Sequence, residues 1–245
     1  MDRPRTLVLT GASRGIGHAT VKRFADHGWR LYTCSREDIP KECRADPNWA
    51  HHVPCDLSVP ADRARFVDEI NERLDGGPLD ALVNNAGISP KTPYKERLGI
   101  LHGEIEAWHR VFELNFYAPL ELARGFAGAL TRARGAVVNI TSIAGHRAHP
   151  FAGSAYSTSK AALSGLTREM AVEFAPLGVR VNAVAPGEIE TEMISSDYEP
   201  LITRIPMQRM GTAAEVASVI HRLCDVDFGY VTGSEIFVTG GQQLL

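Results

Sequence analysis

The sequence predicts one α/β domain over residues 1–245, with a doubly wound parallel sheet of about seven strands between two layers of helices. Short β-rich runs alternate along the chain with longer stretches of helical periodicity, which is the order typical of α/β folds. The first run leads directly into a glycine-rich turn and a helix. A chain of 245 residues with 44% apolar content can bury a full core without dividing into two domains.

The first predicted unit is a strand at 6–10, a glycine turn at 11–17 and a helix at 16–27. In this context a glycine motif binds phosphate, because backbone N–H groups and the helix dipole converge on an anion. The glycines are spaced G-x-x-x-G-x-G rather than G-x-G-x-x-G, and a tight strand-to-helix turn is the alternative. The candidate cofactor contacts here are Gly11, Ser13, Arg14, Gly15, Ile16 and Gly17.

The second predicted strand, 31–35, ends at Ser35 and Arg36. NADP sites supply arginine at this point for the 2′-phosphate, whereas NAD sites place an acid there for the ribose hydroxyls. Arg14 of the glycine turn is a second arginine in reach. The sequence therefore favours NADP, although acids begin at Glu37 and a shift of register would restore NAD.

Strands at 50–54 and 80–87 follow, separated by a helix at 61–74. Asp56 after the third strand is either a helix-start residue or a hydrogen-bond acceptor for adenine. The fourth strand ends in Asn84-Asn85-Ala86-Gly87, where amides can tie strands together and small residues admit a cofactor, but this is also ordinary turn chemistry. After a loop at 88–103, a long helix is predicted at 104–130, and Asn115 near its middle indicates a kink or a functional amide.

The fifth strand, 135–140, is followed by Thr141-Ser142 at the edge where open α/β sheets bind ligands. The next helix, 155–175, carries Tyr156 and Lys160 four residues apart, on one face. A cation about 4 Å away is worth up to about 4 kcal/mol at an effective dielectric of about 20, so Lys160 is expected to lower the pKa of Tyr156. An ordinary surface pair is the alternative, but Lys160 is the single lysine after Lys95 in a stretch with eleven arginines.

His146 and His149 lie between Ser142 and Tyr156 and raise the question of a hydrolase, but the chain has no G-x-S-x-G elbow, and they are interpreted as loop residues. A sixth strand is predicted at 180–185. The polar segment 188–211 is expected to be a substrate lid. A helix at 213–224 and a last strand at 235–238 complete the pattern.

The composition favours small-molecule partners. A formal net charge of −3 gives no footprint for nucleic acid or an anionic membrane, and no apolar segment is long enough to span a bilayer. The four cysteines have no metal-ligand or redox spacing, and the first residues are too short for a signal peptide, so a cytoplasmic protein without a metal is expected.

From Thr6 to Gly241, the glycine turn, the Asn-Asn-Ala-Gly turn, Ser142 and the Tyr-x-x-x-Lys pair resemble the short-chain dehydrogenase/reductase family, closest to its 3-oxoacyl-carrier-protein reductase-like members. The resemblance implies a Rossmann-type fold, a homotetramer or homodimer, and a catalytic tetrad of Asn115, Ser142, Tyr156 and Lys160. It also implies cofactor contacts at Gly11, Gly15 and Gly17 (pyrophosphate), Asp56 and Leu57 (adenine), Asn85, Ala86 and Gly87, and Pro186, Gly187, Ile189 and Thr191 (nicotinamide side).

Three departures from the family pattern concern the substrate. The interval from Ser142 to Tyr156 is one residue longer than the common spacing, the loop 88–103 is longer than usual, and Glu188 stands where an apolar or aromatic residue is common. The expected activity is hydride transfer between NADP(H) and a carbonyl or secondary alcohol, with a 3-oxoacyl thioester as one candidate. The alternatives are an NAD-dependent sugar or polyol dehydrogenase and a catalytically silent NADP-binding regulatory protein.

Overall fold

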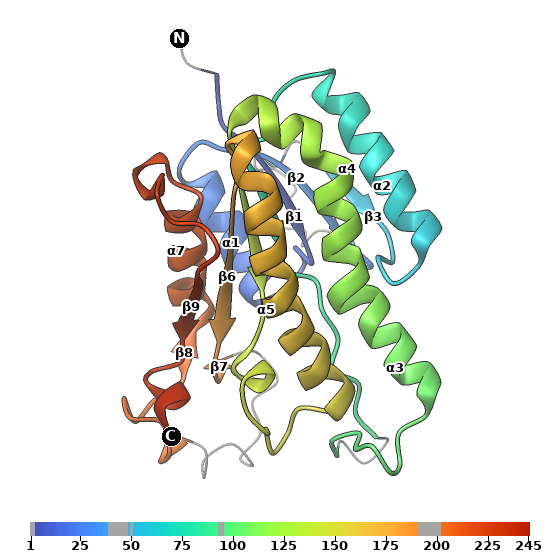
Figure 1. Cartoon of the computed structure of the whole chain (residues 1–245), viewed down its shortest axis with the longest axis vertical. Coiled ribbons are helices and arrows are strands. Elements are labelled where there is room, and N and C mark those ends of the chain that lie inside the picture. Colours follow the sequence, from blue (N-terminus) through green and yellow to red (C-terminus); the bar gives the residue numbers. More distant parts are fainter. Residues whose placement is uncertain (1–2, 39–48, 50, 93–95, 191–201) are drawn as a thin grey trace.

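The computed structural model describes residues 3–38, 49, 51–92, 96–190 and 202–245. Its main sheet has seven strands in the order β3-β2-β1-β4-β5-β6-β9, all paired in parallel, which confirms the predicted sheet (Figure 1). The strand order reverses between β1 and β4, and open α/β sheets bind ligands beside such a reversal. The strands are β1 (Thr6–Thr10), β2 (Arg30–Ser35), β3 (His51–Pro54), β4 (Ala81–Asn84), β5 (Ala136–Ile140), β6 (Arg180–Pro186) and β9 (Glu235–Val238).

Helices cover both faces of the sheet, because side chains alternate along each buried strand. Leu7 and Leu9 of β1 belong to a core shared with α1 (Gly15–Ala25) and α7 (Ala213–Leu223). Val8, between them, belongs to the opposite core, which α2, α4 and α5 cover. These helices span Pro60–Leu74 (α2), Ala118–Ala133 (α4) and Ser154–Phe174 (α5), and the last two run side by side in Figure 1.

The helix predicted at 104–130 consists of three segments. It begins as α3 (Ile105–Phe112), passes through one π-helical turn (Glu113–Tyr117) and continues as α4. Asn115 lies inside the π turn, so the irregularity that its sequence position indicated is present. A π turn holds one extra residue and shifts the facing side chains relative to a regular helix.

The segment predicted as a lid, 188–211, is described only at its two ends. Its first residues form β7 (Ile189–Glu190), which pairs in parallel with β8 (Gly211–Thr212). A capping box of Thr212 and Glu215 then begins α7. Thr191, a predicted cofactor contact, lies outside the described residues.

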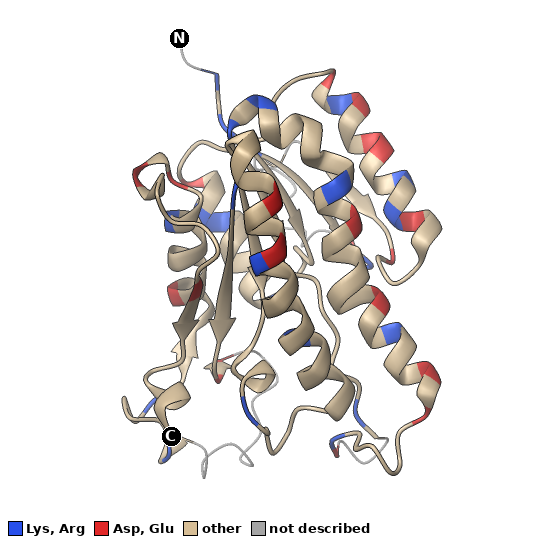
Figure 2. Cartoon of the chain, viewed as in Figure 1, with Lys and Arg blue, Asp and Glu red and all other residues tan. Residues whose placement is uncertain are grey.

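Charged residues of both signs are spread along α2 and along the α3–α4 helix (Figure 2). Among the residues that the structure describes, no helix combines the length and the apolar character needed to cross a bilayer.

Candidate active site

A cavity of about 660 Å³ opens where β1, β2 and β4 end, at the reversal of strand order. It brings together most of the cofactor contacts predicted from the sequence. The predicted residues that line it are Gly11, Ser13, Arg14, Gly15, Ile16, Gly17, Ser35, Arg36, Asp56, Leu57, Asn85, Ala86 and Gly87.

The glycine turn fits a dinucleotide. A Cβ atom on Gly17 would lie 1.9 Å from the carbonyl oxygen of Gly11, and Gly11 itself has φ +72°, so both positions require glycine. Helix α1 begins at Gly15, and the side chain of the preceding Arg14 does not cap its first turn. The first N–H groups of α1 are therefore left for an anion, as a pyrophosphate-binding turn requires.

Amide side chains tie this turn to the sheet, which is one of the two alternatives that the sequence left open. Asn85 Nδ2 donates to the carbonyl oxygens of Thr10 and Gly11, both at 3.0 Å. Asn84 Nδ2 donates across to Asn139 Oδ1 of β5 at 2.8 Å. These bonds fix the backbone on which Asn85 and Ala86 line the cavity.

The end of β2 has both kinds of residue that distinguish NADP from NAD, namely arginine and an acid. Arg36 and Arg14 line the cavity, and so does Glu37. The Glu37 carbonyl accepts hydrogen bonds from the Ser35 hydroxyl and from Nε2 of His52, the latter at 3.0 Å. This holds the backbone at the turn, while the arginines supply positive charge beside it.

The acid/base residues meet at the carboxyl end of β5. Ser142 lies just after β5, and its hydroxyl is near enough to the phenol of Tyr156, in the first turn of α5, to lower the pKa of that phenol. Lys160 Nζ lies 5.7 Å from the centroid of the Tyr156 ring and donates to the Ile140 carbonyl at 2.6 Å. Serine, tyrosine and lysine therefore share one edge of the sheet.

Asn115 and Lys160 connect this group with the cavity. A Cβ atom on Gly87, which lines the cavity, would lie 3.3 Å from Asn115 Oδ1 and 3.4 Å from Lys160 Nζ. The amide of Asn115 also bonds both backbone groups of Ile88, accepting from its N–H at 2.9 Å and donating to its carbonyl at 3.1 Å. The predicted tetrad therefore lies together at one end of the cavity.

The expectation that Lys160 lowers the pKa of Tyr156 is wrong. Burial raises the pKa of the phenol, the Ser142 hydrogen bond lowers it, and the negative charge of Glu188 raises it further. Burial also lowers the pKa of Lys160 itself, to about 8. Desolvation dominates because both groups are enclosed, and it disfavours the charged form of each.

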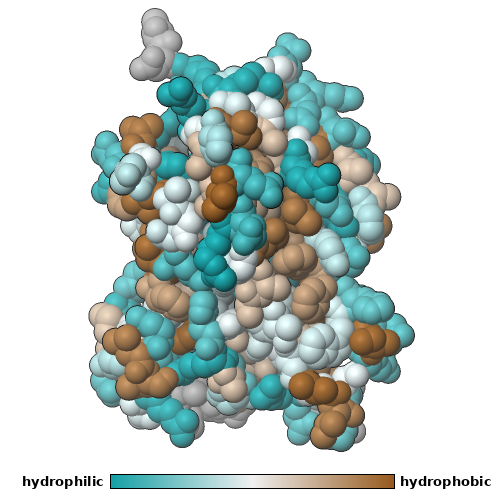
Figure 3. Space-filling view, viewed as in Figure 1, coloured by the Kyte–Doolittle hydropathy of each residue, from teal (hydrophilic) through white to brown (hydrophobic). Residues whose placement is uncertain are grey.

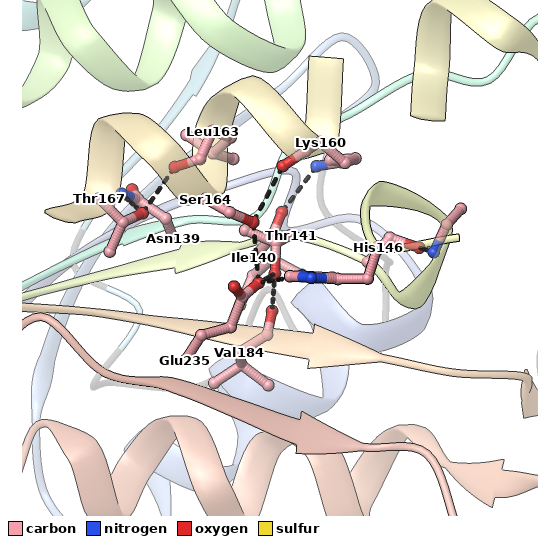
Figure 4. A network of polar contacts seen from close by, with 12 residues as sticks. Asn139, Ile140, Thr141, His146, Lys160, Leu163, Ser164, Thr167, Val184 and Glu235 are labelled. Atoms are coloured by element: carbon pink, nitrogen blue, oxygen red, sulfur yellow. Dashed lines mark hydrogen bonds and ion pairs between the residues drawn. The ribbon is translucent and has the colours of Figure 1, made fainter. Parts of the chain in front are cut away.

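The carboxylate of Glu235 hydrogen-bonds one residue next to Ser142 and one residue on α5 (Figure 4). Glu235 Oε1, on β9, accepts from Thr141 Oγ1 at 2.5 Å and from Ser164 Oγ at 3.0 Å, and His146 Nε2 lies 3.1 Å away. Thr141 directly precedes Ser142, and Ser164 bonds the Lys160 carbonyl at 3.1 Å. The role of Glu235 was not predicted, because nothing in a strand pattern marks one acid as largely enclosed.

Part of the cavity wall differs from the prediction. Of the predicted contacts after β6, Pro186, Gly187 and Ile189 do not line the cavity. Among the residues described in that segment, Glu190 does. The histidines interpreted as loop residues do lie in the loop before α5, but each pairs with a carboxylate, His146 with Glu235 and His149 with Glu188. The other lining residues not predicted as contacts are Cys34, Glu37, Cys55, Ile88 and Leu114.

The sheet, its reversal and the glycine-lined cavity define a dinucleotide-binding α/β protein. A family model described as enoyl-(acyl carrier protein) reductase matches residues 11–243. The protein FixR of Bradyrhizobium diazoefficiens is 51% identical over 98% of this chain and 87% of its own length. The chain belongs to the short-chain dehydrogenase/reductase family and is an oxidoreductase that binds NAD or NADP.

Solved structures agree with this assignment. An oxidoreductase of the family from Brucella ovis, in complex with a partially ordered NAD, is 51% identical, has a TM-score of 0.83, and matches 97% of this chain and all of its own. A 3-oxoacyl-[acyl-carrier protein] reductase from Brucella melitensis with bound NAD is 32% identical, with a TM-score of 0.87 over 98% of this chain and 92% of its own.

Proposed function

We propose that the chain transfers a hydride between NADP(H) and a carbonyl or secondary alcohol. The observation that carries the proposal is that Ser142, Tyr156 and Lys160 lie together, with Lys160 Nζ 5.7 Å from the centroid of the Tyr156 ring, at the end of a dinucleotide cavity that Lys160 and Asn115 border at Gly87. When bound, the nicotinamide supplies the hydride in the reducing direction and accepts it in the other.

Each residue of the tetrad has its own role in this proposal. The hydroxyl of Ser142 holds the carbonyl oxygen, and Tyr156 gives its proton to that oxygen. The raised pKa of Tyr156 suits this step, because the phenol keeps its proton at neutral pH until the oxygen takes it. Lys160 binds the cofactor ribose. Asn115 fixes the backbone at Ile88 through its hydrogen bond and maintains a path of water molecules to solvent. Pro186, Gly187, Ile189 and Thr191 are proposed as contacts on the nicotinamide side.

Exchanging Tyr156→Phe tests the chemistry directly. The variant lacks the acidic hydroxyl, so kcat is expected to fall by about 10²-fold to 10⁴-fold while cofactor affinity stays nearly unchanged. Cofactor oxidation in the presence of carbonyls gives kcat, and quenching of protein fluorescence gives the cofactor Kd. A Phe variant with wild-type turnover would remove Tyr156 from the mechanism.

Arg36 and Arg14 support NADP as the cofactor, since both line the cavity at the end of β2. NAD is the alternative, supported by Glu37 at the same place and by the NAD in the Brucella ovis relative. Arg36→Asp is expected to lower kcat/KM for NADPH by about 10-fold to 100-fold, the loss of a charged hydrogen bond, and to leave NADH use intact. Equal losses for NADPH and NADH would contradict the assignment.

The substrate class is narrowed by a screen. The 3-oxoacyl reductase from Brucella melitensis supports a 3-oxoacyl thioester as one candidate. A sugar or polyol is the runner-up. Cofactor oxidation is to be followed with ketones, oxoacyl thioesters and sugars. A protein that binds cofactor tightly and reduces none of them would be a catalytically silent regulatory protein instead.

We propose in addition a cytoplasmic homotetramer of single-domain subunits, each with residues 188–211 as a substrate lid. Apolar atoms reach the surface along α4 and α5 (Figure 3). Val172 on α5 is 73% exposed, and Tyr117, the last residue of the π turn before α4, is 42% exposed. Exposed apolar side chains on two long neighbouring helices are suited to packing against further subunits. The molar mass from light scattering tests the assembly.

A further inference from the structure

Three loops meet beside the catalytic tyrosine, one after each of β4, β5 and β6. Glu188, two residues after β6, accepts a hydrogen bond from His149 of the loop before α5, with Oε1 and Nε2 2.7 Å apart. Lys91, from the loop after β4, donates to the carbonyl of Phe151 in that same loop before α5. The side chains of His149 and Glu188 are only 8% and 10% exposed. A buried carboxylate therefore lies at the carboxyl edge of the sheet, where open α/β sheets bind ligands.

The hydrogen-bond pattern shows which ring nitrogen of His149 donates to Glu188. Its Nδ1 accepts from the backbone N–H groups of Phe151 at 3.2 Å and of Ala152 at 3.1 Å. A nitrogen that accepts two N–H bonds carries no hydrogen, so the ring hydrogen is on Nε2 and points to Glu188. His149 is therefore the donor of this hydrogen bond, and Oε1 of Glu188 is its acceptor.

The charge of Glu188 is felt by the groups around it. It raises the pKa of Tyr156, and it raises that of Lys91, which burial and Arg97 lower. Lys91 is exposed, while Glu188 is enclosed. Of the charged side chains described on these loops, Glu188 is thus the enclosed one and Lys91 the exposed one, while the buried cation beside the phenol, Lys160, comes from α5.

We propose that Glu188, positioned by His149, recognises the substrate by accepting a hydrogen bond from a donor group next to the reacting carbon. The favoured substrate is a small carbonyl or alcohol with a neighbouring ammonium or hydroxyl, and a neighbouring carboxylate is rejected. A carboxylate acceptor strengthens a bond to a cationic donor and repels an anion. An acyl chain offers no donor at this position. The inference rests on the proposed function, because it assigns selectivity to the same site.

Four carbonyls of similar size test the inference: aminoacetone, hydroxyacetone, 2-butanone and pyruvate, with Glu188→Gln and the cofactor-loaded wild type. Glutamine keeps an oxygen for Nε2 of His149, so the fold is expected to persist, and the charge alone is removed. The ratio of kcat/KM for aminoacetone to that for 2-butanone is expected to fall about 10-fold to 100-fold, and the relative value for pyruvate to rise. Glu104→Gln, which removes an exposed carboxylate, is the matched control and should leave all ratios unchanged.

Two further measurements separate the possible outcomes. Ligand-observed NMR of the four compounds with the cofactor-loaded enzyme reads selectivity without turnover. Glu188→Asp keeps the charge and should keep the preference for aminoacetone if the glutamine variant does not fold. Binding that depends on Glu188 in an enzyme that reduces nothing would overturn the proposed function and support the inference. Unchanged ratios in Glu188→Gln, or no binding of any of the four, would overturn the inference, whereas turnover lost in Tyr156→Phe supports the function independently.

Discussion

Lys160 is the residue whose charge changes within an ordinary pH range. Its side chain is buried at 3% exposure, and burial lowers its pKa to about 8. Its ammonium donates to the Ile140 carbonyl and lies beside Gly87 at the cavity. An arginine in its place would stay charged at every accessible pH. The single lysine after Lys95 is therefore also the group that can titrate there.

We expect cofactor binding to weaken at alkaline pH. The ammonium predominates below about pH 8 and is lost above it, so the cofactor Kd should be flat from pH 6.5 to about 8 and then rise up to about tenfold per pH unit. Fluorescence titration of the cofactor at each pH measures this. Lys160→Met should bind weakly and show no alkaline limb, and a wild-type Kd that is equal at pH 7 and pH 9.5 would contradict the role of the charge.

Most of the site could be predicted from motifs whose residues are contiguous in the chain. The contacts between loops could not be predicted. The glycine turn could be located because strand, turn and helix are contiguous in the chain. The pair of His149 and Glu188 could not, because two side chains 39 positions apart meet only in the folded chain. The direction of the Tyr156 pKa shift was wrong for a related reason, since the sequence shows the neighbouring charge but not the burial that outweighs it.

At the level of elements, Glu235 joins three pieces of secondary structure. One carboxylate oxygen on β9 bonds Thr141 at the end of β5 and Ser164 on α5. Glu235→Ala should reduce the free energy of unfolding by about 2–3 kcal/mol, because hydrogen bonds to a charged group are lost at a site where Glu235 is only 15% exposed. Urea denaturation measures the loss. Glu173→Ala, an exposed change on α5, should stay within about 0.5 kcal/mol, and an equally small effect at Glu235 would contradict the role of the network.

Most strand ends were predictable to within one residue, because continuous apolar runs mark buried parallel strands, but the fourth strand was predicted to reach residue 87 and ends at Asn84. The first helix was predicted to reach residue 27 but ends at Ala25, where the chain turns through Gly28 to bury Trp29. The π turn at 113–117 could be suspected from Asn115 but not identified, since a single extra residue leaves the apolar period nearly unchanged. The short β7–β8 pair gave no signal, as strands of two residues have no pattern.

For the whole molecule, His221 links pH to stability. It lies on α7 and packs against α1 and the turn after it, with its ring 4.9 Å from that of Phe24 and 4.2 Å from that of His27, and no described residue hydrogen-bonds either ring nitrogen. Burial, then the charges of His27 and Arg23, lower its pKa to about 4. The unfolded chain takes up a proton near pH 6.5 that the folded chain refuses, so this stability is lost as the pH falls from about 6.5 to 4.

His221→Phe should remove that part of the acid sensitivity. Phenylalanine keeps an aromatic ring against Phe24 and cannot be protonated, so its free energy of unfolding should fall less between pH 7 and pH 5. One proton contributes a slope of at most about 1.4 kcal/mol per pH unit. Urea midpoints of both proteins at pH 7, 6 and 5 give the comparison. Parallel curves for the two proteins would show that other groups cause the acid loss.

The π turn has a consequence for how this helix can vary in length. Removing one residue from a regular α-helix rotates everything beyond it by about 100°, because each turn holds 3.6 residues. Here the extra residue of the π turn lies within 113–117. Deleting it would restore regular α-helical winding and would break the hydrogen bond between Asn115 and Ile88. A single-residue deletion within this turn is therefore expected to preserve the winding of α3 and α4 and to remove the contact between Asn115 and Ile88.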